Sequence, residues 1–339
     1  MNCNERVMIM NVLYTCDNNY IWIMGISMIS LFENNKAQKR LNVYLLGDCI
    51  SEDNKKILQM IATKYERKCF IIDVPKLDIP EVLISQRWPI SAFTRLFSGQ
   101  LLPIELDRIL YLDCDTIIEG DISPLDNFDM QGKVLCGIKD CIGKTYKQNI
   151  GLPGDGLYVN AGVLLLDLNK LREIDILKEI KKYLNKYTSI INYADQDILN
   201  GVFSSVAGVL SPEYNVMTLL AVYSYEDVKK LRFPTNFYTK KEVENAVKHS
   251  KIIHYTTCML NVRPWFSNSR HPYVNEFAKY KAISPWADVE LTEFKFKSKV
   301  SKVVAIVQKL PYCLAIRILG LIHAELKPLY IRVKANLNK

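Results

Sequence analysis

The sequence predicts an α/β protein with a mixed, mainly parallel sheet, followed by a helical and basic C-terminal region. From its start, apolar runs of strand length alternate with runs of helix length, and the connections are short. This alternation is typical of parallel strands joined by right-handed crossover helices. With 49% hydrophobic and 24% charged residues among 339, the chain has the composition of a protein with a large core, which excludes intrinsic disorder for most of it. We place a main domain at 1–270 and the helical region at 271–339.

The first part of the chain contains strands and helices in alternation. The first strand ends in a polar turn at 15–19, and the second helix opens with Ser51, a residue type that caps helix N-termini. In order, we predict a strand at 7–14, a helix at 20–33, a strand at 41–46, a helix at 51–65 and a strand at 69–74.

Later elements are separated by longer irregular segments. Residues 90–98 have helical character, and 108–112 form a short apolar run that we predict to be a buried strand. Beyond them we predict strands at 134–139, 163–168 and 252–255, and helices at 175–187 and 195–203.

The net charge of +8 is concentrated at one end of the chain. Residues 295–339 contain ten Lys and Arg residues and one acid, so the remainder is close to neutral. This distribution argues against a nucleic-acid partner, whose binding surface would carry positive charge across the domain. Within 299–310, apolar residues follow helical spacing and lysines lie elsewhere on the helix. Such a basic amphipathic helix can lie in an anionic membrane surface, and the alternative is a helical bundle packed on the main domain.

Cysteine usage and hydropathy indicate the compartment. Nine cysteines are scattered without a Cys-x-x-Cys pair, which favours a reducing cytosol over a disulfide-rich secreted domain. Residues 1–12 match a first strand better than a signal peptide. The longest uncharged apolar stretch near the start, 20–32, is too short to span a bilayer.

Two acids separated by one residue follow the strand at 108–112. In an extended chain Asp113 and Asp115 share one face, where two carboxylates can hold a hard divalent cation. Such an ion binds phosphate oxygens and neutralises charge on a leaving diphosphate. One alternative is a loop whose acids face water. Another is a haloacid dehalogenase-type phosphatase with Asp113 as nucleophile, although about a hundred residues precede a motif that normally opens that domain.

Two further segments place polar residues at the ends of elements. Asp195 and Gln196 stand where a helix should begin, so Asp195 is either a helix N-cap or, with Gln196, a contact to a sugar hydroxyl or a reacting carbon. Asn160 enters a buried strand, and Ala161 with Gly162 lets a ligand approach the backbone closely. The alternative for this second segment is an ordinary junction between a turn and a strand.

The last segment ends the strand at 252–255. His254 is either a satisfied core histidine or the third ligand of a Mn²⁺ site completed by the two aspartates. Arg263, which precedes Pro264 and Trp265, is either a solvated charge or a donor to phosphate oxygens.

Together these motifs resemble glycosyltransferase family 8, the retaining sugar-nucleotide transferases. The resemblance runs from about residue 7 to 275, and its segments occur in the order of the family: 14–20, 91–96, 112–115, 160–163, 195–200, and 254–255 with 263–265. It implies a GT-A-type, Rossmann-like nucleotide-sugar-binding fold and transfer with retention of anomeric configuration.

The resemblance also implies roles for individual residues. Asp113, Asp115 and His254 would hold Mn²⁺ or Mg²⁺. Catalytic roles would go to Gln196, Asp195 and Asp140, with Gln196 beside the anomeric carbon either as a weak nucleophile or as support for front-face attack. The residues that it assigns to binding the UDP-sugar are Thr15, Cys16, Asp17, Asn19, Tyr20, Arg95, Asp113, Cys114, Asp115, Asn160, Ala161, Gln196, His254, Thr257 and Arg263.

The segment after His254 departs from the family pattern of His-x-x-Gly followed by Lys-Pro-Trp. Thr257 replaces the glycine, Arg263 replaces the lysine, and the segment is longer. Arginine also binds phosphate, often in a bidentate way. We therefore expect a cytoplasmic enzyme, peripheral on the inner face of the membrane, that moves galactose or glucose from a UDP-hexose to a glycan or lipid-linked glycan. A non-catalytic UDP- or glycan-binding module is the alternative that the Thr257 departure favours.

Overall fold

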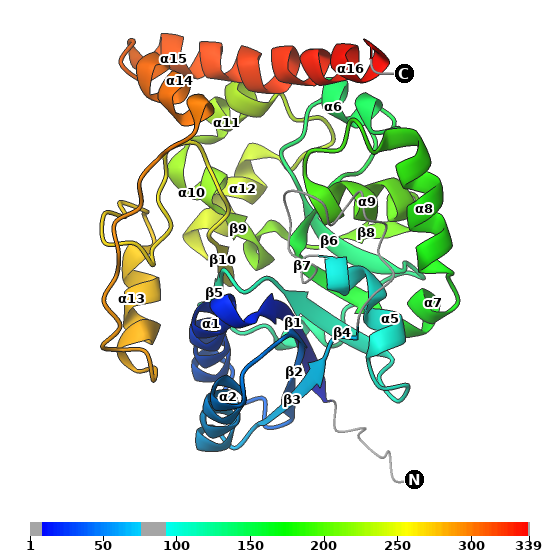
Figure 1. Ribbon diagram of the computed structural model, residues 1–339, viewed down its shortest axis with the longest axis vertical. Helices are drawn as coiled ribbons and strands as arrows, with labels where there is room; N and C mark the ends of the chain where they lie inside the picture. The colour runs from blue at the N-terminus through cyan, green and yellow to red at the C-terminus, as the bar shows by residue number, and fades with distance from the viewer. Residues whose placement is uncertain (1–8, 76–92, 338–339) are drawn as a thin grey trace.

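The computed structural model describes residues 9–75 and 93–337. Its central sheet contains β1 (Met10–Asp17), β2 (Leu41–Asp48), β3 (Lys68–Asp73), β4 (Arg108–Leu112), β6 (Leu135–Lys139), β7 (Val159–Asp167) and β8 (Ala207–Val209). The strand order is β3-β2-β1-β4-β7-β6-β8 (Figure 1). Strands β3, β2, β1 and β4 are parallel, β7 is antiparallel to both of its neighbours, and β8 is parallel to β6. The predicted mixed, mainly parallel sheet is confirmed.

A second sheet of three strands lies beside the carboxyl end of β4. It consists of β5 (Thr116–Ile118), β10 (Ile252–His254) and β9 (Val216–Met217). Strand β10 is antiparallel to β5 and parallel to β9, and this register pairs His254 with Thr116. A residue from the late part of the chain thereby reaches the loop that follows β4.

Helices pack around the two sheets. Those up to the end of β7 are α1 (Ile21–Asn34), α2 (Glu52–Lys64), α5 (Ser98–Leu101) and α6 (Lys144–Asn149). Those that follow are α7 (Leu168–Arg172), α8 (Ile176–Tyr187), α9 (Ala194–Phe203), α10 (Thr218–Val222), α11 (Tyr225–Arg232), α12 (Lys240–Lys248) and α13 (Val274–Ala282). Short 3₁₀ turns are η1 (Asn18–Tyr20), η2 (Arg95–Phe97), η3 (Ser123–Leu125) and η4 (Pro212–Tyr214).

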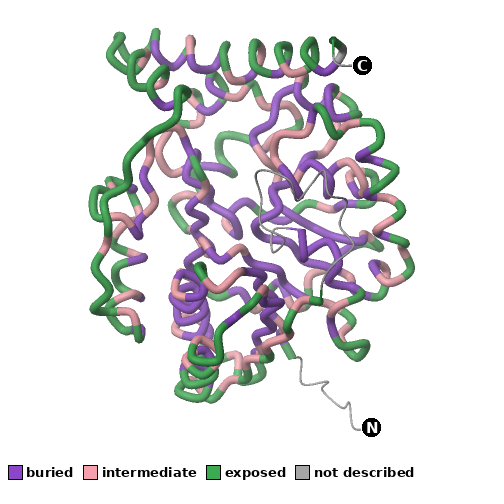
Figure 2. Tube along the Cα trace, viewed as in Figure 1, coloured by how far each residue is buried: buried purple, intermediate pink, exposed green. Residues whose placement is uncertain are grey.

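Successive side chains of β1 pack into two different hydrophobic clusters, one on each face of the central sheet. Val12 and Tyr14 pack into one hydrophobic cluster with α1 and α2, whereas Leu13 packs into another with α8 and α9. Successive side chains of a strand point to opposite faces, so a sheet covered on both sides needs apolar residues in continuous runs. The inner strands β1, β2, β4, β6 and β7 are accordingly buried along most of their length, whereas the edge strands β3 and β8 are not (Figure 2).

Several predicted boundaries shift in the structure. Strand β1 continues through the predicted turn to Asp17, because its pairing with β2 extends to that residue. The chain turns only at η1, where the Asp17 carboxylate accepts the backbone N–H groups of Asn19 and Tyr20. Strand β7 begins at Val159 rather than 163, because its pairing with β6 resumes beyond an irregularity at Gly137. Residues 90–92 of the helix predicted at 90–98 lie outside the described residues, and η2 with α5 follows them.

Helices of the C-terminal region lie across one end of the main domain (Figure 1). They are α14 (Lys299–Val307), α15 (Tyr312–Gly320), the π-helical segment η5 (Leu321–Leu326) and α16 (Lys327–Leu337). Helix α15 packs on α11, and Gly320 allows this approach because a Cβ there would collide with the carbonyl oxygen of Lys230. Ile316 and Leu319 join the main hydrophobic cluster. The predicted basic helical region is therefore present, and the boundary at 270 stays a prediction. Among the described residues, no helix combines the length and the apolarity needed to cross a bilayer.

Candidate active site

An acidic pair and a histidine meet just beyond the carboxyl end of β4. Atoms of Asp113, Asp115 and His254 that could each donate to a metal ion lie within 4.8 Å of one another. Nε2 of His254 is 3.1 Å from Oδ1 of Asp115 and 3.6 Å from Oδ2 of Asp113. Carboxylate oxygens and an imidazole nitrogen suit a divalent ion such as Mn²⁺. The three residues therefore fit a metal ion, and the structure brings together the set that the sequence predicted.

The backbone fixes the positions of these side chains. The N–H group of Asp113 donates to the carbonyl oxygen of Gly162 on β7, at 2.8 Å. Strand β5 follows Asp115 and pairs with β10, which returns His254 to the same place. Gly162 is needed at this crossing because a Cβ would collide with the imidazole ring of His254. The sequence predicted a close approach to the backbone at Gly162, and in the structure the His254 ring makes this approach.

Two polar groups orient the cluster. Oδ1 of Asn215 lies 2.9 Å from Nδ1 of His254, so a protonated Nδ1 donates to it and Nε2 faces the aspartates. The hydroxyl of Tyr111 donates to Oδ1 of Asp113 at 2.6 Å. The sequence motifs assigned neither residue to the site. Tyr111 stands two positions before Asp113. Because alternate residues of an extended chain share one face, this spacing could have indicated that Tyr111 lies beside Asp113. No local pattern pointed to Asn215, which is distant in sequence.

The charges around Asp115 keep it ionised. Burial alone would raise the pKa of Asp115, but His254 and Arg263 outweigh this effect and lower it to about 2. Nη2 of Arg263 is 3.1 Å from Oδ2 of Asp115. Burial lowers the pKa of His254, yet the two aspartates reverse this effect and leave it raised. Asp115 therefore provides negative charge that a metal ion requires.

Arg95 connects the metal cluster to α9. Its Nη1 is 2.8 Å from Oδ1 of Asp113, and its Nε is 3.0 Å from Oδ2 of Asp195. Nη1 also donates to the carbonyl oxygen of Ala161 at 2.8 Å, and the guanidinium lies over the ring of Tyr111. Burial raises the pKa of Asp195 to about 6, although Arg95 opposes this shift. Asp195 is not the helix N-cap, which is Tyr193. The predicted contact of Arg95 with the sugar or diphosphate stays a prediction.

Gln196 is held in one orientation from several sides. Its Oε1 accepts Nδ2 of Asn160 and the backbone N–H of Ala161, both at 3.0 Å. Its Nε2 donates to Oδ2 of Asp140 at 2.9 Å and to the hydroxyl of Tyr158 at 3.2 Å. Four residues that the resemblance grouped together therefore form one hydrogen-bonded network, to which the structure adds Tyr158.

A cavity of about 700 Å³, a volume that includes the open solvent at its mouth, lies beside this network. Asp140, Asn160 and Gln196 line it, together with the exposed Thr257. Oδ1 of Asn160 accepts Nδ2 of Asn215 at 2.8 Å, so the residues at the cavity are linked to the histidine of the metal cluster. A concave site with a few convergent polar groups is where a small ligand binds in most proteins.

Asp197 is a buried anchor behind Gln196. Its carboxylate accepts the hydroxyl of Tyr158 at 2.7 Å and that of Tyr146 at 2.6 Å. It also accepts backbone N–H groups of Asn192 and Tyr193, both at 2.8 Å. Burial raises the pKa of Asp197 while these donors oppose the shift. The sequence motif at 195–200 includes Asp197 but indicated no role for it, because nothing in the motif distinguishes a buried acid from an exposed one.

The turn after β1 lies beside the metal cluster. The ring of Tyr20 is 38% exposed, and its hydroxyl accepts Nη1 of Arg263 at 3.4 Å. Asn19 is exposed as well, whereas Asp17 is occupied in capping η1. Thr15 is buried, and its Oγ1 lies 3.2 Å from the hydroxyl of Tyr111. An aromatic ring and polar groups are thus available there to a base and a ribose.

Two of the predicted binding residues turn their side chains into the core. Cys16 and Cys114 are both buried, and Sγ of Cys114 donates to the carbonyl oxygen of Thr15 at 3.4 Å. A ligand would therefore meet the backbone of these two residues rather than their thiols.

Comparison with known proteins agrees with this geometry. A family model described as glycosyl transferase family 8 matches residues 11–269. Lipopolysaccharide 1,2-glucosyltransferase of Escherichia coli K12 is 29% identical over 286 residues, which cover 82% of this chain and 79% of that protein. General stress protein A of Bacillus subtilis is 24% identical over 281 residues, which cover 82% and 95%. The crystal structure of galactosyltransferase LgtC with donor and acceptor sugar analogues superposes with a TM-score of 0.67 at 24% identity, covering 81% of this chain and 96% of that one. This structural likeness shows the GT-A fold.

Proposed function

The chain belongs to glycosyltransferase family 8, and we propose from this premise that it is a retaining enzyme that moves galactose or glucose from a UDP-hexose to a glycan acceptor. Relatives named for lipopolysaccharide glucosyl and galactosyl transfer support a hexose donor and a glycan acceptor. The observation that carries the proposal is the position of Gln196, which is hydrogen-bonded into a network that ends at the proposed metal ligand His254.

We propose Mn²⁺ or Mg²⁺ as the cofactor, held by Asp113, Asp115 and His254. When bound, the ion neutralises the charge that develops on the departing diphosphate. The side chain of Arg263 supports the same task because its guanidinium already lies 3.1 Å from Asp115, beside the predicted metal. Tyr20 offers an exposed ring for the uracil.

The residues at the cavity would position the sugar. The amide group of Gln196 donates both to Asp140 and to Tyr158, so its Oε1 is turned toward Asn160 and Ala161 at the donor-sugar pocket. A carboxamide fixed in this way can stabilise positive charge on an anomeric carbon without having to reorient during the reaction. Asp140 is a candidate acceptor for a hydroxyl proton of either sugar.

The test is turnover of UDP-galactose and UDP-glucose with Mn²⁺, measured as UDP release with and without glycan acceptors. We expect Asp113→Asn and Asp115→Asn to abolish metal-dependent turnover, because each removes a charged ligand. Asp155→Asn, in an exposed loop, is the matched control and should retain activity. Full turnover by either site variant, with a native circular dichroism spectrum, would contradict the proposal.

The same assay separates the alternatives. The family match does not favour a haloacid dehalogenase-type phosphatase, and Oδ1 of Asp113 is already bound by Tyr111 and Arg95. Release of inorganic phosphate from a monoester would revive that hypothesis. A UDP-binding module would bind UDP without any turnover.

We also propose that the enzyme sits peripherally on the inner, cytoplasmic face of a membrane through its C-terminal helices. Apolar side chains along these helices are exposed, among them Val300, Ile306, Tyr312, Leu326, Tyr330 and Val333. Exposed basic residues accompany them, among them Lys299, Lys302, Lys309, Arg317, Arg332 and Lys334. Large apolar groups interspersed with cations are typical of helices that lie in anionic interfaces.

Vesicle sedimentation tests this attachment on the full chain. Changing Val300, Ile306 and Tyr312 together to Ser should release the protein from phosphatidylglycerol vesicles. Ile104→Ser removes a side chain that is 69% exposed on another part of the surface and serves as the control. Undiminished vesicle binding by the triple variant would contradict the attachment.

A further inference from the structure

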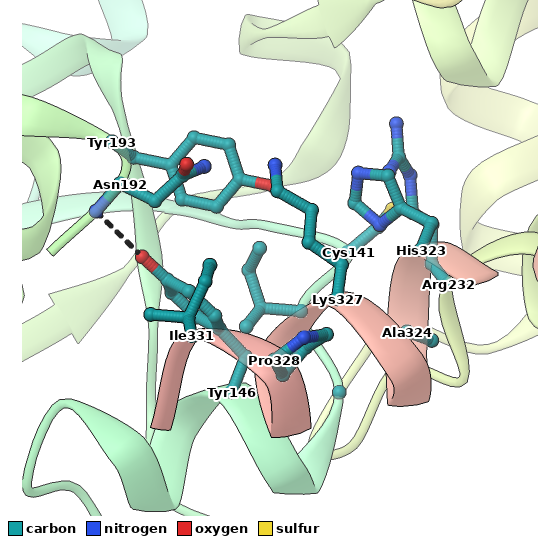
Figure 3. A pocket seen from close by; sticks show the side chains of 12 residues that line it. Cys141, Tyr146, Asn192, Tyr193, Arg232, His323, Ala324, Lys327, Pro328 and Ile331 are labelled. Atoms are coloured by element: carbon teal, nitrogen blue, oxygen red, sulfur yellow. Dashed lines mark hydrogen bonds between the residues drawn. The ribbon is translucent and has the colours of Figure 1, made fainter. Parts of the chain in front are cut away.

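The C-terminal helices support one wall of the cavity proposed to hold the sugars, which we call the sugar cavity. Ile142 lines this cavity and belongs to a small hydrophobic cluster with Ala335 of α16, against which Ile331 also packs. Arg232, the last residue of α11, lines the same cavity and contacts His323 of η5 (Figure 3). The family match ends at residue 269. A segment outside that match therefore borders the pocket for the sugars.

His323 accepts a hydrogen bond from Arg232. Nη1 of the guanidinium is the donor, because arginine has no acceptor atom, so Nε2 of the imidazole carries no proton. Burial, together with the charges of Arg232 and Lys327, lowers the pKa of His323 to about 2, which keeps the ring neutral. A neutral acceptor orients the guanidinium without neutralising its charge.

The charge of Arg232 is not shared with a carboxylate among the residues that the structure describes. Asp227 of the same helix pairs with Lys230 instead, at 3.7 Å. A guanidinium has five N–H donors in a planar fork, so Arg232 has donors left after it binds His323. Because Arg232 is half-buried and lines the sugar cavity, these donors are available to a ligand there.

The sugar cavity extends from the donor site toward the C-terminal helices. None of the three proposed metal ligands lines it, and Arg263, which we assign to the phosphates, contacts the metal cluster instead. The donor hexose is assigned to Gln196, whose network joins the cavity to the metal cluster. The side of the cavity that adjoins the C-terminal helices, where Arg232 lies, is therefore left for the acceptor.

The backbone around His323 departs from a regular α-helix. Residues Leu321–Leu326 form a π-helical turn between α15 and α16, and such turns occur frequently at functional sites. The turn is fixed to the main domain, because Glu325 accepts the hydroxyl of Thr145 at 2.7 Å. It thereby holds the imidazole of His323 against Arg232.

We propose that Arg232 binds a hydroxyl oxygen of the terminal hexose of the acceptor and that His323 positions it. This inference rests on the proposed function and gives the C-terminal helices a role in recognising the acceptor, in addition to membrane attachment. Hydrogen bonds from a charged donor are about twice as strong as neutral ones. Loss of one such bond costs about tenfold or more in affinity.

The first test is steady-state transfer from UDP-hexose, with Mn²⁺, to a panel of methyl glucosides and methyl galactosides. Transfer is measured as UDP release above the hydrolysis seen without acceptor. Arg232→Met should raise the acceptor KM about tenfold or more, with a much smaller change in kcat and in donor KM. Lys229→Met, which removes an exposed lysine of the same helix, is the matched control and should keep the acceptor KM. A rise in donor KM instead would place Arg232 at the donor sugar and overturn the proposal.

Variants of His323 test the positioning role. His323→Met removes the acceptor nitrogen and should raise the acceptor KM several-fold, whereas His323→Gln keeps an acceptor atom and should restore most of the affinity. His249→Met removes an exposed histidine and is the control. Thermal melts accompany the kinetics, because a purely structural role would lower the melting temperature of both His323 variants without a rise confined to the acceptor KM. Equal acceptor KM values for His323→Met and wild type would show that the histidine does not position Arg232.

Hydrolysis of UDP-hexose without acceptor separates failure of this inference from failure of the proposed function. Hydrolysis together with transfer that is insensitive to Arg232→Met would refute the inference and leave the glycosyltransferase assignment intact. Hydrolysis without transfer to any hexoside of the panel would also overturn the inference, since the proposed contact is to a hexose hydroxyl. If the protein turns over no sugar nucleotide, the proposed function fails and the inference fails with it.

Discussion

His254 and Asn215 form a buried pair in which the ring Nδ1 lies 2.9 Å from the carboxamide Oδ1. The carboxamide also donates through Nδ2 to Asn160, so its orientation is fixed from both ends. A fixed acceptor at Nδ1 leaves Nε2 facing Asp113 and Asp115, where it would bind a metal ion once its proton is displaced. The metal site therefore depends on a residue that supplies no ligand.

Asn215→Leu should lower metal affinity because His254 loses the acceptor that selects its tautomer. Loss of such a partner costs about 10- to 100-fold in affinity, measurable by Mn²⁺ titration calorimetry. Asn215→Asp keeps an acceptor oxygen and should retain most of the affinity. Asn245→Leu breaks a similar pair with His249 at the surface and is the matched control. Equal Mn²⁺ affinity for Asn215→Leu and wild type would show that the pair does not position the ligand.

Arg95→Met should destabilise the protein because it leaves the buried carboxylate of Asp195 and the half-buried one of Asp113 without their shared cation. Removing one partner of a buried ion pair costs about 3–5 kcal/mol in the free energy of unfolding, measured by urea denaturation. Arg95→Lys keeps a charge and should lose less.

The loss in Arg95→Met should also depend on pH. Asp195 already has a pKa of about 6 with Arg95 present, and removing the cation raises it further. A carboxyl whose pKa is raised on folding opposes folding only where it is ionised, so the loss should be large near pH 7.5 and smaller near pH 5, where the group is protonated. An equal loss at both values would contradict this explanation.

Tyr158→Phe should slow the chemical step, because the Tyr158 hydroxyl accepts Nε2 of Gln196 and donates to Asp197. Without it the carboxamide of Gln196 is less firmly held, and a misplaced catalytic group lowers kcat by about tenfold or more. Tyr146→Phe is the matched variant, since it also removes a donor to Asp197 but does not contact Gln196. Steady-state kinetics should show the larger fall in kcat, with donor KM little changed, in Tyr158→Phe. Equal falls in both would point to Asp197 rather than Gln196.

Local patterns predicted the fold and the acidic pair of the metal cluster. The alternation of strand and helix was enough for the parallel half of the sheet, and Asp113 with Asp115 followed a buried run that could hardly be anything but a strand. His254 required the family resemblance, because a lone histidine at a strand end is usually a core residue. Its true environment depends on the pairing of β10 with β5, which joins segments more than a hundred residues apart.

The supporting residues were not predictable in the same way. Asn215 and Tyr158 act through hydrogen bonds to residues far along the chain, and no spacing rule connects such partners. Arg95 was assigned to a substrate from the resemblance, yet its charge is shared by Asp113 and Asp195 in the structure. Tertiary contacts decide which polar groups face a ligand and which face one another, so a motif identifies residues more reliably than it identifies their roles.

Asp115 is a proposed metal ligand and also the ion-pair partner of Arg263. Substituting Arg263 should therefore strengthen metal binding but weaken donor binding. Its Nη2 lies 3.1 Å from Oδ2 of Asp115, whereas Nε2 of His254 lies 3.1 Å from the other oxygen, Oδ1. Arg263→Met removes a positive charge next to the metal site and should tighten Mn²⁺ binding in the absence of donor by several-fold. It also removes a phosphate donor, so KM for the UDP-hexose should rise about tenfold. Calorimetry with Mn²⁺ alone and steady-state kinetics measure the two effects separately, and Arg270→Met, in the same segment, is the control. Weaker Mn²⁺ binding in Arg263→Met would mean that the arginine organises Asp115 rather than competing for it.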